Sequence, residues 1–131
     1  MTIRYERAPD IQQRVGRISR QLGLKHINER VVCVRSRGSR ARYTVARCHA
    51  MSRVFQFALG VDMHYVIEVI SETFDTMSEP EQTRTLIHEL LHIPKAFGGG
   101  LKGHKNMRRK VNSLYRQLQQ LEKELGEDGT L

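Results

Sequence analysis

The chain has no tryptophan, two cysteines and three prolines, and only 6% of its 131 residues are aromatic. Two cysteines, Cys33 and Cys48, are too few for a disulfide framework or a cysteine-rich zinc module, so we expect buried free thiols. No apolar run approaches the length of a membrane span, and the residues after Met1 lack the apolar core of a signal peptide. The composition therefore excludes disulfide-rich and membrane-spanning classes and predicts a cytoplasmic protein.

The remaining composition is that of a globular domain. Hydrophobic residues make up 39% and charged residues 27% of the chain, and no internal repeat or low-complexity segment is visible. A chain of this length can bury a modest but sufficient core. We expect one domain over residues 1–131.

One motif carries chemistry: the segment from His88 to His92 spells His-Glu-Leu-Leu-His, the HExxH pattern. Two histidines one helical turn apart can present ring nitrogens to a single cation, and the intervening glutamate can deprotonate an activated water. At 100° per residue, His92 lies about 40° and Glu89 about 100° from His88, whereas Leu86 and Leu90 lie at about 160° and 200°. The helix can therefore bury one side and present a metal site on the other.

The residues around the motif predict where this helix begins and ends. Ser78 to Glu81 form a capping box, in which the serine accepts from an early amide, and Pro80 suits the first turn. Downstream, Pro94 disfavours helical geometry at Ile93. The sequence predicts a helix of about four turns with HExxH in its last turns.

A catalytic zinc ion needs a third protein ligand and an open position for water. After Pro94, a run of glycines favours a turn that returns His104 to the metal. His104 is also close in sequence and lies where the next helix is expected to begin. The interval is longer than in the metzincin pattern HExxHxxGxxH, so this is not a metzincin. The alternatives that remain open are His26, His49, His64, Glu72 and Asp75, with Cys48 and His49 as an accessory pair.

Two more helices are expected. Apolar residues recur at helical spacing from Ile11 to Leu22, after Pro9 and before Gly23. A longer apolar stripe runs from Met107 to Leu125 and predicts an amphipathic helix packed on the domain, with a coiled-coil partner as the alternative.

Four short segments are expected to form strands, and the arginine-rich residues 35–40 form a turn. The clearest strand is Tyr65 to Ile70, which is apolar except for Glu68 and precedes the HExxH helix. The predicted fold class is α+β, with an N-terminal helix, a small and mainly antiparallel sheet, the HExxH helix and a long C-terminal helix. The predicted strands are Val31–Val34, Tyr43–Arg47, Arg53–Leu59 and Tyr65–Ile70.

This order of elements resembles the minimal zincin domain of the SprT-like metalloproteases, which include Spartan. The run from His88 to His104 is more similar to HExxH metallopeptidases of archaea and phages, where His-Glu-Leu-Leu-His-Ile-Pro precedes a phenylalanine, glycines and a histidine. This similarity extends from about Val31 to His104. It implies that His88, His92 and His104 bind zinc and that Glu89 is the catalytic acid/base.

The resulting hypothesis is a zinc metallopeptidase acting on a polypeptide substrate. Glu89 takes the proton of the attacking water and passes it to the leaving amine. An edge strand beside the active helix would receive the substrate, and Tyr65–Ile70 or Arg53–Leu59 could do so. A further donor is needed for the oxyanion. The sequence leaves four candidate donors open, namely Arg47, His49, Tyr65 and Tyr115.

Charge supports a second class of hypothesis. The net charge is +8, with six arginines and no acid from Val31 to Val61. This stretch, together with the basic residues at the start of the last predicted helix, could form a phosphate track and bind nucleic acid without sequence preference. The alternative function is thus a metal-stabilised nucleic-acid-binding or adaptor module without hydrolysis, and a protease acting on nucleic-acid-associated proteins would combine both. The candidate phosphate contacts are Arg35, Arg37, Arg40, Arg42, Lys105, Arg108 and Arg109.

Overall fold

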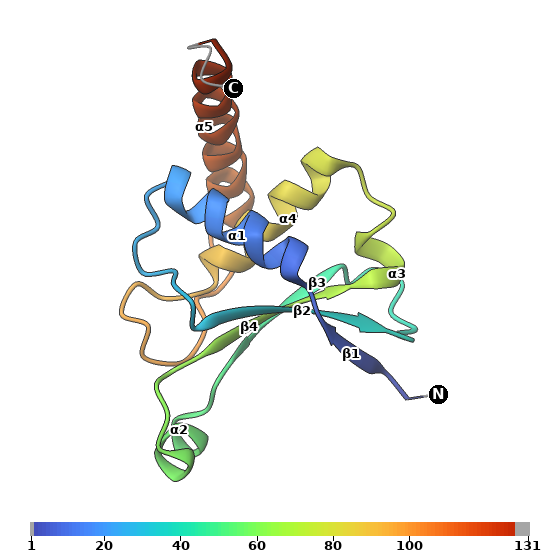
Figure 1. Ribbon diagram of the computed structural model, residues 1–131, viewed down its shortest axis with the longest axis vertical. Coiled ribbons are helices and arrows are strands. Elements are labelled where there is room, and N and C mark those ends of the chain that lie inside the picture. The colour runs from blue at the N-terminus through green and yellow to red at the C-terminus, as the bar shows by residue number, and fades with distance from the viewer. Residues whose placement is uncertain (1, 128–131) are drawn as a thin grey trace.

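The structure is a computed structural model that describes residues 2–127. The described chain forms four strands and five helices, and Figure 1 shows their arrangement. In chain order they are β1 (Arg4–Arg7), α1 (Pro9–Gln21), β2 (Val31–Arg37), β3 (Ala46–Ala50), α2 (Arg53–Leu59), β4 (Tyr65–Ile70), α3 (Ser71–Phe74), α4 (Glu79–Leu91) and α5 (Met107–Glu127).

The four strands form one mixed sheet in the order β1-β2-β4-β3. The β1–β2 and β3–β4 pairs are antiparallel, whereas β2 and β4 run parallel from the Val31–Tyr65 pair to the Ser36–Ile70 pair. The α+β class and the mainly antiparallel sheet are therefore confirmed. This order leaves β1 and β3 as edge strands, and β4 is central.

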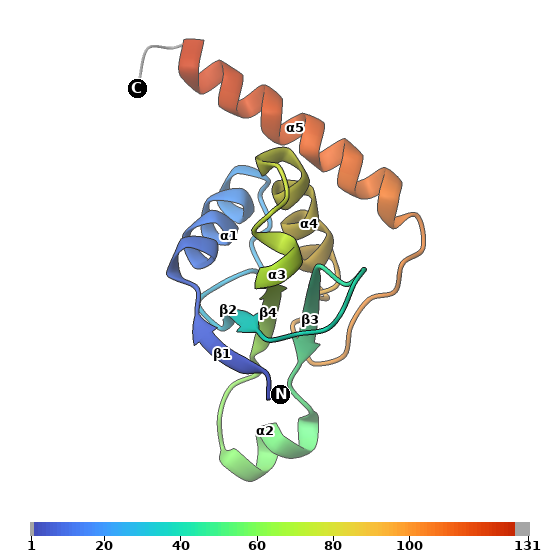
Figure 2. The same ribbon diagram turned by 90° about the vertical axis from the view of Figure 1, so that its right-hand side faces the viewer.

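Helices α1 and α4 cover one face of the sheet, and α5 crosses over them in both views (Figures 1 and 2). Burying an aliphatic side chain stabilises the fold by about 1.5–3 kcal/mol, so this shared layer holds α4 firmly on the sheet. No helix among the described residues combines the length and apolarity needed to span a membrane. The buried side chains of this layer include Ile11, Val15, Ile18, Tyr65, Ile67, Val69, Leu86 and Leu90.

Helix α4 begins and ends close to where the sequence predicts. The Ser78 hydroxyl caps the helix by accepting from the amide of Glu81 at 3.3 Å. At the other end, α4 stops at Leu91 and His92 occupies the C-cap position. The HExxH motif therefore lies in the last turn, where the chain leaves the helix and can bring a distant residue back beside it.

The prediction of a strand at Arg53–Leu59 is wrong, because this segment is helix α2. Its valine and phenylalanines favour strands, but strand propensity depends on a half-buried sheet surface, and no residue of α2 is buried. Local caps decide the outcome instead. Ser52 accepts from the amide of Phe55, and Gly60 adopts a left-handed conformation with φ of 65°.

The edges of the sheet also differ from the prediction. The strand expected at Tyr43–Arg47 begins later, at Ala46, and β2 extends to Arg37, into the expected turn. β1 was not predicted, because all four of its residues are exposed and it shows no alternation of apolar and polar residues. Backbone pairing with β2, rather than side-chain burial, holds β1 in place.

Candidate metal centre

Three histidines converge at the end of α4. The Nε2 atoms of His88 and His92 lie 3.2 Å apart. The ring of His104, which precedes α5, is centred 5.2 Å from the His88 ring and 4.6 Å from the His92 ring. One ligand atom from each histidine lies within 4.8 Å of the others. Two nitrogens bound at 2.0–2.1 Å to a tetrahedral zinc ion would be about 3.3 Å apart, so the residues present fit such an ion.

Among residues 2–127, these three histidines are the only cluster of histidine, cysteine or carboxylate side chains with the spacing of a metal site. The alternative ligands lie elsewhere, and each contacts another group. Their contacts are His26 with the Ile93 carbonyl, His49 with Glu68, His64 with the Asp62 carbonyl, Glu72 with the Gly38 amide, and Asp75 with Arg35.

The accessory pair of Cys48 and His49 is not assembled either. Cys48 packs against the core, and burial raises the pKa of its thiol to about 12. Successive side chains of a strand point to opposite faces, so His49 lies on the other face of β3. The two side chains cannot bind the same ion. Both cysteines are free thiols; Cys33 is buried, as the sequence predicts, whereas Cys48 is only partly buried.

The ring of His92 is oriented by the loop that follows α4. Its Nδ1 lies 2.5 Å from the carbonyl oxygen of Lys102, and the Lys102 amide donates to the His92 carbonyl at 2.8 Å. A proton on Nδ1 that is donated to a carbonyl leaves Nε2 as the lone-pair nitrogen. Burial, followed by the neighbouring imidazoles of His92 and His104, lowers the pKa of His88. Both effects favour the neutral rings that bind metals.

Tyr65 anchors the glycine-rich part of this loop. The tyrosine is fully buried in β4, and its hydroxyl accepts from the amide of Gly99 at 2.9 Å and donates to the carbonyl of Gly100 at 3.2 Å. The ring also packs edge-to-face against Phe97. Gly99 and Gly100 have φ of 99° and 75°, a conformation that side chains rarely adopt. Tyr65 is therefore a positioning residue for the loop that carries His104, and its hydroxyl, one of the four candidate oxyanion donors, contacts Gly99 and Gly100 instead.

We expect Tyr65→Phe to weaken zinc binding roughly tenfold, the effect typical of removing an outer contact of a metal site. The ring still fills the core, but the loop loses both hydroxyl contacts. Competition with a chromophoric chelator would measure the zinc affinity, and a thermal melt would report the fold. Tyr5→Phe, at an exposed position of β1, is the matched control. Equal zinc affinities for Tyr65→Phe and Tyr5→Phe would contradict this role.

Glu89 directly follows His88 on α4, and only 6% of its surface is exposed. Burial raises the pKa of its carboxyl to about 7, although the charge of His49 acts in the opposite direction. A carboxyl group with a pKa near neutrality can both accept and donate a proton at physiological pH. Its position and pKa therefore suit a group that shuttles a proton.

Glu89 and His88 line a cleft of about 370 Å³ between α4 and the segment that leads into β3. Arg84 lies one turn before His88 on the same side of α4, and its guanidinium stacks on the ring of Tyr115 at 4.9 Å. This arginine was not identified from the sequence, although its position four residues before His88 places it on the same face of the helix. The other residues that line the cleft are Tyr43, Thr44, Val45, Ala46 and Thr85.

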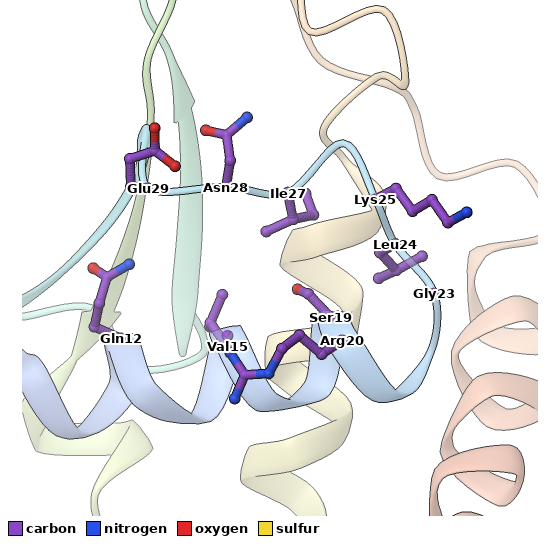
Figure 3. Close-up of a pocket in the computed structure, with 11 residues that line it drawn as sticks. Gln12, Val15, Ser19, Arg20, Gly23, Leu24, Lys25, Ile27, Asn28 and Glu29 are labelled. Atoms are coloured by element: carbon purple, nitrogen blue, oxygen red, sulfur yellow. The ribbon is translucent and has the colours of Figure 1, made fainter.

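A larger hollow of about 560 Å³ lies between α1 and the segment from Gly23 to Glu29 (Figure 3). Its lining contains neither Glu89 nor any of the three converging histidines. Size alone does not identify a reactive site. The smaller cleft beside α4 is the one that brings titratable and metal-binding groups together.

Two further candidates for an oxyanion donor bind a buried carboxylate instead. His49 Nε2 lies 2.8 Å and Arg47 Nη1 3.4 Å from the Glu68 carboxylate. Both side chains lie on the face of β3 opposite Ala46 and Cys48, which pack against the core. Of the four candidates, Tyr115 is the one whose ring contacts Arg84, a residue that lines the cleft.

The arginine-rich segment of residues 35–42 is less available for phosphates than its sequence suggests. Arg35 donates to both carboxylate oxygens of Asp10, at 2.6 and 2.8 Å, and also contacts Asp75. These hydrogen bonds lower the pKa of Asp10 to about 2. Arg37 donates to Glu6 at 2.8 Å. Because two arginines of this segment already pair with acids, the prediction of a phosphate track gains no support.

The comparisons with known proteins agree with the class that the site suggests, a metal-dependent peptidase. A family model described as "Putative phage metallopeptidase" matches residues 3–125. The chain therefore belongs to this family of phage metallopeptidases. Neither the curated proteins nor the solved structures that were searched gave a match. Membership implies a metal ion and a polypeptide substrate, while the resemblance to SprT-like proteases stays a prediction.

Proposed function

We propose that this protein is a zinc peptidase in which His88, His92 and His104 hold the metal and Glu89 is the general base. The observation that carries this proposal is the convergence of the three histidines within 4.8 Å, together with a buried glutamate that lines the same cleft as His88. Three neutral imidazoles leave one position of a tetrahedral zinc ion open, which is the usual arrangement in catalytic zinc sites.

A bound zinc ion supplies Lewis-acid chemistry, because it polarises the peptide carbonyl and lowers the pKa of water. The Glu89 carboxylate takes one proton from the attacking water as the water oxygen bonds to the carbonyl carbon. When the carbon–nitrogen bond breaks, Glu89 returns this proton to the leaving amine. Burial keeps the carboxyl near the pKa at which both transfers are accessible.

The substrate would lie along β3. This strand is the edge of the sheet and leads away from the residues that line the cleft. The two strands that the sequence suggested for this role cannot serve, because β4 is central and Arg53–Leu59 is helical. Pairing with an edge strand requires an extended segment, so the proposed substrate is a flexible or unfolded polypeptide. No observation on the described residues favours a nucleic-acid-associated target.

Metal removal tests this function. We expect the zinc-loaded protein to cleave reduced, carboxymethylated casein, and we expect chelation followed by desalting to abolish cleavage. Adding back one equivalent of zinc should restore it, because the histidine site is otherwise intact. Gel electrophoresis with elemental analysis of each sample would measure both quantities. Undiminished cleavage by the metal-free protein would contradict the proposal.

A further inference from the structure

Helix α2 exposes an unusual amount of apolar surface. The exposed fractions are 77% for Val54, 63% for Phe55, 91% for Phe57 and 64% for Leu59. These four residues are called the α2 patch below. Figures 1 and 2 show α2 projecting from the end of the sheet remote from α5. Contiguous apolar surface of this kind on a protein commonly marks an interaction site.

The patch is not needed to form the helix that carries it. Ser52 caps the N-terminus and Gly60 the C-terminus, and no residue of α2 is buried. At 100° per residue, the apolar side chains cover an arc of about 200°, and only Arg53 and Gln56 lie outside it. Folding therefore gives no reason for two phenylalanines at these positions, whereas binding does.

The base of α2 is attached to the loop of the candidate metal centre. The Arg53 side chain donates from Nε to the carbonyl of Gly98 at 3.1 Å. Met63, which follows α2 in the chain, is buried, and its Cε would lie 3.2 Å from a Cβ placed on Gly99. The same loop continues to His104. The α2 patch thus has a defined position relative to the three histidines.

The free edge of β3 leads from the cleft to this patch. The Val45 carbonyl accepts from Ile70, and the Met51 amide donates to His64, so both residues bond towards β4. The alternation of an antiparallel ladder then directs the amides and carbonyls of Ala46, Cys48 and Ala50 to the open edge. β3 begins beside the cleft, is about 13 Å long at 3.3 Å per residue, and ends just before α2.

We propose that the α2 patch docks an apolar segment of the polypeptide substrate, about four to seven residues from the bond that is cleaved. The inference rests on the proposed function, because it takes the ligand of β3 to be a polypeptide. A chain paired with Ala46, Cys48 and Ala50 and continuing in the same direction meets the patch next. The preferred substrate is therefore an extended polypeptide with exposed aliphatic or aromatic side chains, such as an unfolded protein presents.

Charge around the patch favours this occupant over a lipid surface or a nucleic acid. From Ser52 to Val61 the only charged residue is Arg53, and its side chain already donates to Gly98. Binding to anionic membranes and to phosphates relies on clusters of basic side chains. An apolar peptide needs no such cluster, since burial of the phenylalanines supplies the affinity.

The test is a binding assay that does not depend on turnover. The Glu89→Gln variant, loaded with zinc, is titrated into two fluorescent peptides of about 16 residues, long enough at 3.3 Å per residue to cover β3 and α2. The peptides differ only in four adjacent positions near one end, which are Phe, Leu, Val and Phe in one and Ser or Gly in the other. We expect tighter binding of the apolar peptide. Adding Phe55→Ser and Phe57→Ser should raise its Kd at least about tenfold.

Tyr5→Ser removes an aromatic ring that is 66% exposed on β1, the opposite edge of the sheet, and is the matched control. It should leave the Kd unchanged. Equal affinities of the two peptides, or an unchanged Kd in the double phenylalanine variant, would overturn the inference. The inference would also be overturned if the double phenylalanine variant lost a dimer in sedimentation, or lost binding to vesicles, while its affinity for the apolar peptide stayed the same. These results would assign the patch to a second copy or to a membrane.

Failure of this inference can be distinguished from failure of the proposed function. A wild type that cleaves casein while the double variant binds the apolar peptide normally would overturn docking on α2 alone. Zinc-loaded protein that binds the peptide through Phe55 and Phe57 but cleaves no substrate would leave the docking site in place and overturn the peptidase assignment alone.

Discussion

Replacing Glu89 by glutamine is expected to reduce peptide cleavage by a factor on the order of 10²–10⁴ while leaving one zinc ion bound per chain. Glutamine has the size and shape of glutamate but cannot accept the proton of the attacking water. The three imidazoles that hold the ion remain in place. Values of kcat/KM on a fluorogenic peptide, with elemental analysis of the same samples, would measure both effects.

The fold should tolerate this change. Burial raises the pKa of Glu89 to about 7, which means that the surroundings disfavour its charged form. A neutral amide at this position should therefore preserve the free energy of unfolding, and a thermal melt would test that. Glu79→Gln, at the exposed first residue of α4, is the matched control and should retain wild-type turnover. Full activity of Glu89→Gln, or loss of its zinc, would contradict the assigned role.

The sequence predicts the three long helices α1, α4 and α5 well because each carries its own signal. In α1, Ile11, Val15 and Ile18 recur at helical spacing and are buried. In α4, Ser78 provides a cap that forms as expected. These signals are local, so a single sequence contains them. The HExxH motif is equally local, since His88 and His92 are one turn apart on one helix.

Two segments were misassigned, one because its strand propensity was given more weight than its local caps and one because its bounds depend on tertiary context. The segment Arg53–Leu59 has strand propensity, yet its ends are capped and it lies outside the sheet, so it forms a helix. The edge strand β3 starts at Ala46 because its pairing register with β4 begins at the Ala46–Val69 pair. Register depends on which residues of distant strands meet, and composition alone does not specify it.

The candidate site also combines features that the local sequence predicts with features that depend on distant residues. A turn that returns His104 towards α4 could be predicted from the glycines that precede it. The groups that hold this turn could not, because Tyr65 is 34 residues away from Gly99 and contacts it through a single hydroxyl group. The sequence also gives no indication of the contact between the His92 ring and the Lys102 carbonyl, because every residue type has a backbone carbonyl.

His104→Ala should weaken zinc binding by more than about 100-fold, because it removes a direct ligand, and removing even outer contacts costs 10–100-fold. The two remaining imidazoles of His88 and His92 would hold the ion only with additional water. Zinc affinity can be measured by chelator competition on untagged protein. The variant keeps an open position for water on any zinc that it still binds. We therefore expect cleavage to decrease in step with the fraction of chains that hold zinc.

Thermal stability gives an independent measure of the same loss. A ligand that binds only the folded state at 100 times its Kd stabilises the protein by about 2.7 kcal/mol, so a 100-fold loss of affinity removes most of this gain. Zinc should therefore raise the Tm of the wild type but not that of His104→Ala. His64→Ala removes a partly exposed ring that contacts the Asp62 carbonyl, outside the three-histidine cluster, and should respond to zinc as the wild type does. If zinc raised the Tm of His104→Ala by the full amount, the third ligand would have to be another group, and the convergence of the three rings would not define the metal site.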